Sequence, residues 1–578
     1  MKKRKIPPQW LTKFEKSGKT ESPNYDQTLK YFQMFESFSP YVKIRSIGLS
    51  PQKREIKIII VSKDKAFSPE KAKQTGKAIV LIQNGIHPGE IEGKDACMLL
   101  LREMLVTREK EHLLDKVILL IIPVLNVDGH ERVSPFNRPN QNGPLKMGWR
   151  TNALNLNLNR DYLKADTPEI QSFLKMFNEW LPDFMVDNHT TNGADYQYHV
   201  TYGLATHQNI DRGLLEWIQK KYLPYLIQSV ENDGFLTGPY MEFKDSIIEK
   251  GILDLPVPPR LSHGYCAAQN RICLLVETHS LKPFANRVYS TKSMMEHTID
   301  FINKNSSELI RLNAEADRNT IKNYLIQKRK FPLVLVGTGK YEKYSFKGYQ
   351  WFDEYSEITG SVVRKYTEEP IQIDIPVFSQ AKSAKKIIVP QAYLIPKEFS
   401  DIIKILRIHG IRLRYPKTGK TVTVERYRFR NVNFASRPYE GRHLPSFECE
   451  SFFESFKIPP GMIEVPLNQR GLRIIVNLLE PEAPDSFVNW GFFNAFFERK
   501  EYAEAYVMEP YARVMLENNE QIRNEFFKKI NNDENFRNNP SERLDFFYRQ
   551  SPFFDKGENV YPILRLVNNN YQNTGNKN

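Results

Sequence analysis

The sequence has few cysteines and no long hydrophobic run. Its 578 residues include 4 cysteines, and none of them forms a Cys-x-x-Cys pair, so a zinc site built from thiolates is not predicted. Cys273 lies in an apolar run, and we expect a buried thiol there rather than a disulfide to Cys266. Because no stretch approaches the roughly 18 consecutive apolar residues of a membrane span, we expect no transmembrane helix.

The sequence also lacks a dense basic region. The net charge of +14 comes from 82 Lys and Arg against 68 Asp and Glu dispersed along the chain, and only Lys2-Lys-Arg-Lys5 forms a basic run. General solubility explains this charge, so we predict no nucleic-acid partner. The apolar segment that a signal peptide needs does not follow the basic start. We therefore expect a cytoplasmic protein, or a secreted or periplasmic one if the true start lies upstream.

The first 310 residues alternate strand patterns with helix patterns. A hydrophobic content of 40% and a charged content of 26% are typical of a soluble globular protein, and 578 residues imply two or three domains. Strands are predicted at 42–48, 55–62, 77–85, 117–122, 184–187 and 272–277, and helices at 25–38, 91–106 and 167–181. This alternation indicates an α/β fold in which helices sandwich a mixed, mostly parallel sheet.

The pattern changes after residue 310. Strand-like runs, such as 420–434 and then 472–476, are separated by turns rich in Gly, Pro and Lys. From about residue 491 the chain is aromatic and helical, and it closes with a polar tail that we expect to be disordered. We therefore predict an α/β domain over 1–310, a β-rich accessory region over 311–490 and a helical segment with a disordered tail over 491–578.

The segment His87-Pro-Gly-Glu90 follows a predicted buried strand. Its Pro-Gly turn can aim an imidazole and a carboxylate at the same point. Catalytic zinc takes three protein ligands of this kind and leaves one position for water. The spacing alone also arises by chance, so its value depends on a third ligand, a base and a substrate anchor elsewhere in the chain.

Two residues at the ends of other buried strands could complete such a site. Open α/β sheets place their sites at the carboxyl ends of strands, where His189 follows the run 184–187 and Glu277 ends the run 272–276. His189 is the candidate third ligand, and Glu277 is the candidate general base. Their structural alternatives are a hydrogen-bonded loop histidine and a salt-bridged glutamate at a strand end.

Two arginines suggest an anionic substrate. Arg160, after Asn159, offers a planar fork that can bind the free carboxylate of a peptide in a bidentate manner. Arg150 is a second cation that could polarise a carbonyl group and stabilise an oxyanion. Either arginine could instead be an ordinary surface charge.

The order of these motifs resembles that of the zinc carboxypeptidase (funnelin-type) metallopeptidase family. The matching segments, over about residues 20–310, are His87-Pro-Gly-Glu90, Pro123-Val-Leu-Asn-Val-Asp-Gly129, Trp149-Arg150, Asn159-Arg160, His189 and Glu277. The resemblance implies a carboxypeptidase-like fold, with residues 1–310 as the catalytic domain.

The resemblance also implies a role for each matching residue. One zinc ion would be bound by His87, Glu90 and His189, with Glu277 as general acid and base, Arg150 at the scissile carbonyl, and Asn159 with Arg160 at the terminal carboxylate. The sequence departs from the family in two places. Asp161-Tyr162 follows Asn159-Arg160 where the family has Asn and an aromatic residue, and the family's substrate-closing tyrosine has only Tyr265 as a weak counterpart.

These observations predict a zinc-dependent hydrolase that cleaves an amide bond. The most favoured function is a metallocarboxypeptidase that releases C-terminal residues from peptides by means of a zinc-activated water. The expected partner is a peptide or peptide-like substrate with a free carboxylate. The alternatives are a zinc-dependent deacylase of acyl-amino acids and a non-catalytic zinc-containing protein that binds peptides; a cell-wall peptide is a further candidate substrate. The sequence predicts neither the side-chain preference nor the oligomeric state.

Overall fold

The computed structural model describes residues 6–191 and 193–567. The basic run at residues 2–5 and the predicted polar tail at residues 568–578 lie outside these residues. Within them, the structure has no helix that is both long and apolar enough to cross a bilayer. The four cysteines are free, and Cys266 and Cys273 are buried, which confirms the prediction of a buried thiol at position 273.

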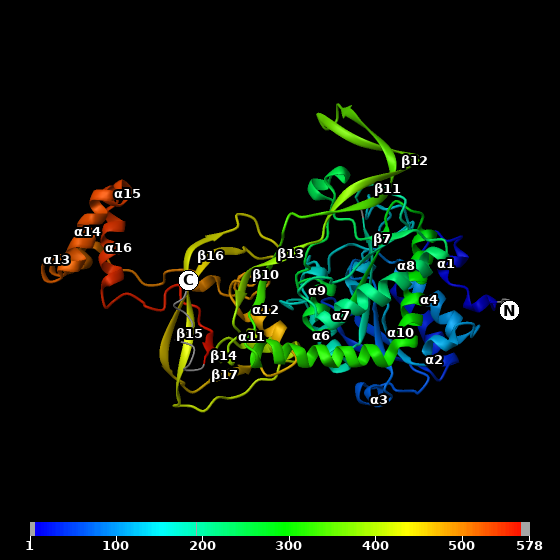
Figure 1. The fold of residues 1–578 in the computed structure, drawn as a ribbon, viewed down its shortest axis with the longest axis horizontal. Coiled ribbons are helices and arrows are strands. Elements are labelled where there is room, and N and C mark those ends of the chain that lie inside the picture. Colours follow the sequence, from blue (N-terminus) through cyan, green and yellow to red (C-terminus); the bar gives the residue numbers. More distant parts are fainter. Residues whose placement is uncertain (1–5, 192, 568–578) are drawn as a thin grey trace.

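The centre of the α/β region is an eight-stranded sheet (Figure 1). In spatial order its strands are β1 (Val42–Leu49), β2 (Glu55–Val61), β4 (Val117–Ile122), β3 (Ala78–Gln83), β5 (Phe184–Thr191), β9 (Ile272–His279), β6 (Val200–Gly203) and β7 (Thr237–Pro239). The four inner strands β4, β3, β5 and β9 run parallel, whereas β2 and β6 pair with them antiparallel. The mixed, mostly parallel sheet predicted from the sequence is confirmed.

Helices cover both faces of this sheet. One face packs against α4 (Glu92–Leu105), α7 (Arg212–Trp217), α8 (Leu223–Asn232) and α10 (Phe284–Ile321). The other face packs against α3 (Pro69–Gln74), α6 (Pro168–Trp180) and α9 (Ser262–Ala268). Further helices are α1 (Lys13–Lys16), α2 (Tyr25–Phe38) and α5 (Val127–Glu131). Both faces of β3 and β4 are therefore buried, as their unbroken apolar sequences predict.

The accessory region is built on a second sheet of five strands. Its spatial order is β16 (Pro445–Lys457), β15 (Thr421–Phe434), β18 (Leu564–Leu566), β14 (Ala392–Pro396) and β17 (Met462–Pro466). Two helices, α11 (Ser400–Ile408) and α12 (Leu472–Leu479), join this region to the same hydrophobic core as α6 and α9. The three-part division of the chain stays a prediction; the structure shows that its first two parts share one core.

The segment 472–476 corrects a strand prediction. Its residues belong to α12, whose side chains are almost all buried. A short apolar run without alternation fits a buried strand or a buried helix equally well, because both hide every side chain. Packing against the rest of the core decides between them.

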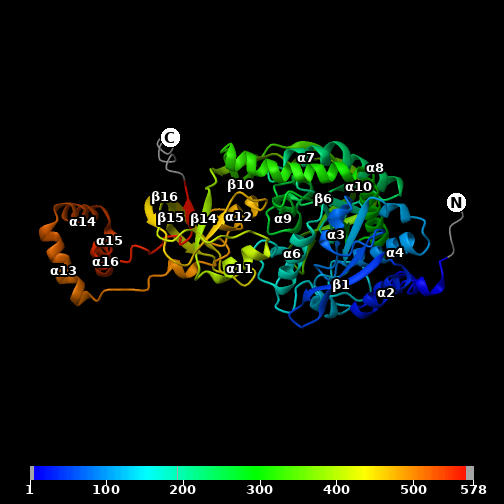
Figure 2. The same cartoon turned by 90° about the horizontal axis from the view of Figure 1, so that it is seen from below.

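Two further units project from this body (Figures 1 and 2). A long hairpin of β11 (Glu342–Ser356) and β12 (Ser361–Phe378) pairs at its base with β8 (Ile252–Leu253), beside the ribbon β10 (Phe331–Gly337) with β13 (Ala381–Ile387). At the other end lie α13 (Ala505–Asn518), α14 (Glu520–Asn532), α15 (Glu534–Asn538) and α16 (Pro540–Gln550). After these helices the chain returns to the accessory sheet as β18.

Candidate metal and substrate site

The turn after β3 brings His87 and Glu90 together. The backbone N–H of Glu90 donates to the carbonyl of His87 over 2.8 Å, and α4 begins directly afterwards at Glu92. Gly93 allows this helix to lie close to β5, because a Cβ there would stand 2.2 Å from Asn84 Oδ1 and 2.6 Å from Asn188 Cβ. The local sequence therefore fixes both the turn and its distance from the neighbouring strand.

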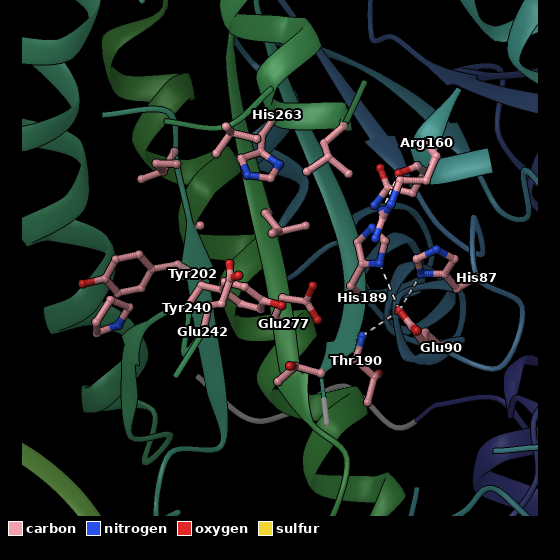
Figure 3. A pocket seen from close by; sticks show the side chains of 18 of the residues that line it. His87, Glu90, Arg160, His189, Thr190, Tyr202, Tyr240, Glu242, His263 and Glu277 are labelled. Carbon is pink, nitrogen blue, oxygen red and sulfur yellow. Dashed lines mark hydrogen bonds and ion pairs between the residues drawn. The ribbon is translucent and has the colours of Figure 1, made fainter. Parts of the chain in front are cut away.

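His189, on β5, meets the turn from the next strand of the sheet (Figure 3). His87 Nδ1 lies 3.2 Å and His189 Nδ1 2.9 Å from the same oxygen, Glu90 Oε2. The ligand atoms of the three residues lie within 4.8 Å of one another, and all three residues are buried. The sequence prediction placed these residues at one sheet edge, and the structure brings them together there.

In each imidazole, the nitrogen that does not contact Glu90 has its own hydrogen-bond acceptor. His189 Nε2 donates to Asp187 Oδ2 over 2.9 Å, and His87 Nε2 donates to Asn157 Oδ1 over 3.0 Å. Acceptors of this kind fix the tautomer and leave the opposite nitrogen free for a metal. Burial lowers the pKa of His87 to about 4, so this imidazole is neutral at pH 7, the form that binds metal. Two imidazole nitrogens and a carboxylate fit a zinc ion.

Glu277 lies beside His189 on the adjacent strand. The two residues are direct partners in the parallel register of β5 and β9, and Figure 3 shows Glu277 on the strand next to His189. Burial, together with the nearby carboxylates of Glu90 and Asp187, raises the pKa of Glu277 to about 8, against the lowering effect of His189. A carboxylate with a raised pKa next to a group of metal ligands is suited to accept and return a proton.

Two arginines contact the second oxygen of Glu90. Arg150 Nη1 lies 3.1 Å and Arg138 Nη2 2.9 Å from Glu90 Oε1. The side chain of Arg150 is 42% exposed, whereas that of Arg138 is 14% exposed. Sequence reasoning found Arg150 but missed Arg138; its only signal is its location between the Asp-Gly and Trp-Arg motifs.

Asn159 and Arg160 lie on a short 3-10 turn, Leu158–Arg160. Asn159 Oδ1 accepts a hydrogen bond of 3.3 Å from the backbone N–H of Ser262, at the start of α9. Arg160 Nε donates to the hydroxyl of Tyr439 over 3.0 Å. Tyr439 belongs to the accessory region, and nothing in the sequence pattern near Arg160 predicts this contact.

The two departures from the family pattern have structural explanations. Asp161 is fully buried, and its carboxylate accepts hydrogen bonds from Lys164 over 2.6 Å and from the Thr167 hydroxyl over 2.6 Å. Asp161 thus stabilises the start of α6 instead of pairing with Arg160. Tyr265 is also fully buried, and its hydroxyl lies 3.0 Å from His409 Nδ1, so it does not line the cavity.

One cavity of about 1310 Å³ joins all the predicted site residues. Its lining includes His87, Glu90, Arg150, Asn159, Arg160, His189 and Glu277. Residues that the sequence did not indicate also line it, including Arg138, Tyr202, Tyr240, Glu242, Asp254, His263 and Tyr439. The cavity is large enough for a substrate that reaches from the metal-ligand group to Arg160.

Comparisons with known proteins point to one family. A model of the zinc carboxypeptidase family matches residues 28–241. Carboxypeptidase 2 of Trichophyton rubrum is 24% identical over 439 residues, which cover 72% of this chain and 74% of that protein. Carboxypeptidase 2 of Trichophyton equinum is 23% identical over 503 residues, covering 82% of this chain and 85% of that protein.

Solved structures with some likeness include two carboxypeptidases. A metallo-carboxypeptidase from Burkholderia cenocepacia is 16% identical, covers 50% of this chain and 70% of its own, and gives a TM-score of 0.37. The carboxypeptidase A from Helicoverpa armigera is 17% identical, with coverage of 51% and 73% and a TM-score of 0.35. Residues 28–241 therefore match the zinc carboxypeptidase family of metallopeptidases, in agreement with the resemblance that the sequence motifs show.

Proposed function

We propose that this protein is a zinc-dependent metallocarboxypeptidase that releases C-terminal residues from peptides. The observation that carries the proposal is the arrangement of three groups in one cavity: a buried His-Glu-His set, a buried carboxylate on the neighbouring strand, and an Asn-Arg pair. A non-catalytic peptide-binding protein would have no use for the carboxylate of Glu277.

His87, Glu90 and His189 would hold one zinc ion. Their donor atoms are two imidazole nitrogens and a carboxylate oxygen, and the supports from Asp187 and Asn157 orient the imidazoles toward Glu90. When bound, zinc lowers the pKa of a water molecule to about 7 and polarises a carbonyl oxygen, as it does in other zinc enzymes.

Glu277 would move the protons of the reaction. Its carboxylate takes a proton from the attacking water as the new C–O bond forms at the peptide carbonyl, and it returns that proton to the leaving nitrogen as the C–N bond breaks. The products are a new carboxylate and a free amine. The raised pKa of about 8 makes Glu277 a stronger base than an ordinary glutamate once it is ionised.

The arginines would orient the substrate. Arg150 and Arg138 present guanidinium groups beside Glu90, where they can donate hydrogen bonds to the carbonyl oxygen as its negative charge develops. Asn159 and Arg160, on a separate turn of the same cavity, can hold the terminal carboxylate through charge-assisted hydrogen bonds. The scissile bond would then lie between the two groups of donors.

A metal analysis combined with a peptide panel tests this function. Purified protein should contain about one zinc per chain, and it should release single C-terminal amino acids from a panel of peptides that differ in their last residue. A chelator should abolish release, and added zinc should restore it. Zinc without release from any peptide, but with cleavage of acyl-amino acids, would replace this proposal with the deacylase; zinc without any cleavage would favour the binding protein.

A further inference from the structure

A small hairpin of the accessory region enters the cavity. Between β15 and β16, Tyr439 and Arg442 pair through backbone hydrogen bonds of 2.9 and 3.1 Å. The two residues between them have positive φ angles, 48° at Glu440 and 76° at Gly441. This combination is that of a tight two-residue hairpin turn, which strongly favours glycine or asparagine. The tip, Tyr439–Arg442, is therefore a defined structure rather than a loose loop.

Three contacts fasten the tip to the α/β region. The carboxylate of Glu440 accepts a hydrogen bond of 2.9 Å from the backbone N–H of Asn157, the residue whose side chain supports His87. Arg442 forms two hydrogen bonds with the Asp166 carboxylate, of 3.1 and 2.8 Å. The tip thus contacts the support of the metal-ligand group on one side and the loop before α6 on the other.

Aromatic packing sets the direction of the Tyr439 side chain. Its ring stacks on Trp490, with centroids 5.9 Å apart and an interplanar angle of 14°, and Trp490 is 2% exposed. The guanidinium of Arg442 lies 4.1 Å from the centre of the Phe492 ring. Because both aromatic partners come from the segment after α12, the hairpin tip is supported from behind by the accessory region.

The hydroxyl of Tyr439 retains a free donor. It accepts the hydrogen bond from Arg160 Nε, and a phenol that accepts one hydrogen bond still carries its own O–H. Tyr439 is 38% exposed and lines the same cavity as Arg160. A carboxylate that binds to Arg160 would therefore lie within reach of this second donor.

We propose that the hairpin tip Tyr439–Arg442 forms a wall of the substrate site, and that the Tyr439 hydroxyl donates a hydrogen bond to the terminal carboxylate held by Arg160. The inference rests on the proposed function, because it assigns a further residue to the same substrate. It gives the accessory region a direct part in recognising a free C-terminus. An amide at that position gains no charge-assisted hydrogen bond from the phenol, so the tip should favour acids over amides.

The test compares a free-acid substrate with its amide in wild type and in Tyr439→Phe. The two ligands are an N-acylated dipeptide ending in the residue that wild type releases best, and the same dipeptide with a C-terminal amide. Dissociation constants are measured by calorimetry on chelator-treated protein, and kcat and KM on zinc-loaded protein. Phe keeps the stacking on Trp490 and removes only the hydroxyl.

We expect Tyr439→Phe to weaken binding of the acid by about 10-fold, the usual effect of losing one hydrogen bond to a charged group. The dissociation constant of the amide, the zinc content and kcat should stay within about twofold of wild type, because the hydroxyl would act in binding alone. Tyr415→Phe is the matched control, since Tyr415 is a tyrosine of the accessory region that is 80% exposed and does not line the cavity.

Two outcomes would overturn the inference: acid binding that is unchanged in Tyr439→Phe, or acid and amide binding that weaken equally. Wild type that releases no C-terminal residue would instead remove the proposed function. The calorimetric comparison separates these failures, because it measures recognition of the carboxylate without turnover. Loss of acid binding in both Tyr439→Phe and Tyr415→Phe would show a general disturbance of the accessory region and would also contradict a specific role.

Discussion

The two halves of the candidate site are built in different ways. The metal-ligand half consists of His87, Glu90 and His189, which lie at the ends of adjacent strands of one sheet, are buried, and are supported by residues of the same α/β region. The substrate half consists of Asn159 and Arg160, which lie on a turn outside the sheet and form hydrogen bonds with residues far along the chain. The first half contacts the accessory region indirectly, through the hydrogen bond of Asn157 with Glu440, whereas Arg160 in the second half contacts the accessory region directly.

This difference indicates which residues can change to alter the substrate that the protein binds. A strand register fixes the metal-ligand atoms relative to one another, so a change there disturbs the core as well as the site. The Asn-Arg turn instead receives its second support from a surface hairpin that can change without disturbing the sheet. We therefore expect mutations in the first half to remove catalysis or metal, and mutations in the second to alter binding alone.

The largest expected effect comes from Glu277→Gln. The amide cannot accept the proton of the attacking water, so kcat should fall by about 10³ or more, while zinc content stays at the wild-type level. The measurement is steady-state hydrolysis of the best peptide together with metal analysis of the same sample. Glu242→Gln, which changes another carboxylate of the same cavity, is the control and should retain most of the activity. Turnover in Glu277→Gln near the wild-type rate would show that another group is the base.

The next effect should come from the support of His189. Asp187 accepts hydrogen bonds from His189 Nε2 over 2.9 Å and from Gln83 over 2.7 Å, and its charge strengthens the imidazole as a ligand. Asp187→Asn should weaken zinc affinity by about 10–100-fold, measured by competition with a chromophoric chelator. Asp183→Asn, just before the same strand and bonded to Ile79 and Asn313, should leave zinc affinity unchanged. Equal affinities in all three proteins would mean that Asp187 does not support the metal.

The metal-ligand half could be predicted from the sequence because its information is local. The turn His87-Pro-Gly-Glu90 follows a strand whose six residues are all buried, and the ends of parallel strands meet at one edge of a sheet. An apolar run marks each strand, and the polar residue that ends it marks the site. This reasoning also gave β1 to β5, β9, α2, α4 and α6, all of which the structure contains, but it did not give β6, β7 or the helices α7 to α10.

The rest of the site could not be predicted because its contacts cross long distances in sequence. Arg160 and Tyr439 are 279 positions apart, and Tyr439 reaches the cavity through a turn that no catalytic motif marks. Arg138 likewise lies in an irregular loop, where the hydrophobic periodicity of the sequence does not predict which way a side chain points. The strand prediction at 472–476 was wrong for the same reason, because long-range packing in the shared core determines that helix α12 forms there.

A pH-dependent effect on stability should follow from His409, at the junction of the two regions. His409 Nε2 donates to the carbonyl of Leu163 over 2.8 Å, and burial lowers its pKa from 6.5 to about 4. The neutral form is favoured in the folded state, so this contribution is complete above the ordinary pKa of 6.5 and is lost as the pH falls toward 4. At about pH 5 the unfolded chain binds a proton at His409 and the folded chain largely does not, so the free energy of unfolding should be about 2 kcal/mol lower than at neutral pH.

The measurement is the difference in Tm between pH 7 and about pH 5 in wild type and in His409→Asn. The substitution removes the titrating group, so the variant should be less stable at pH 7 but should lose less of its Tm on acidification. The exposed His443→Asn is the control, and its pH dependence should match that of wild type. An unchanged pH dependence in His409→Asn would assign the acid sensitivity to other buried groups.

The smallest effect should come from loosening the hairpin tip without touching the substrate. Arg442→Gln removes the ion pair with Asp166 and the contact with the Phe492 ring, but it leaves the hydroxyl of Tyr439 in place. A partly exposed ion pair contributes only about 0.2–1 kcal/mol, so KM for a free-acid peptide should rise only about threefold, with kcat and zinc affinity unchanged. Arg437→Gln, at an exposed position of the same loop, removes the same charge from the accessory region and should leave KM unchanged. A fall in zinc affinity in Arg442→Gln would contradict the separation of the two halves, because it would show that the hairpin tip also supports His87 through Glu440 and Asn157.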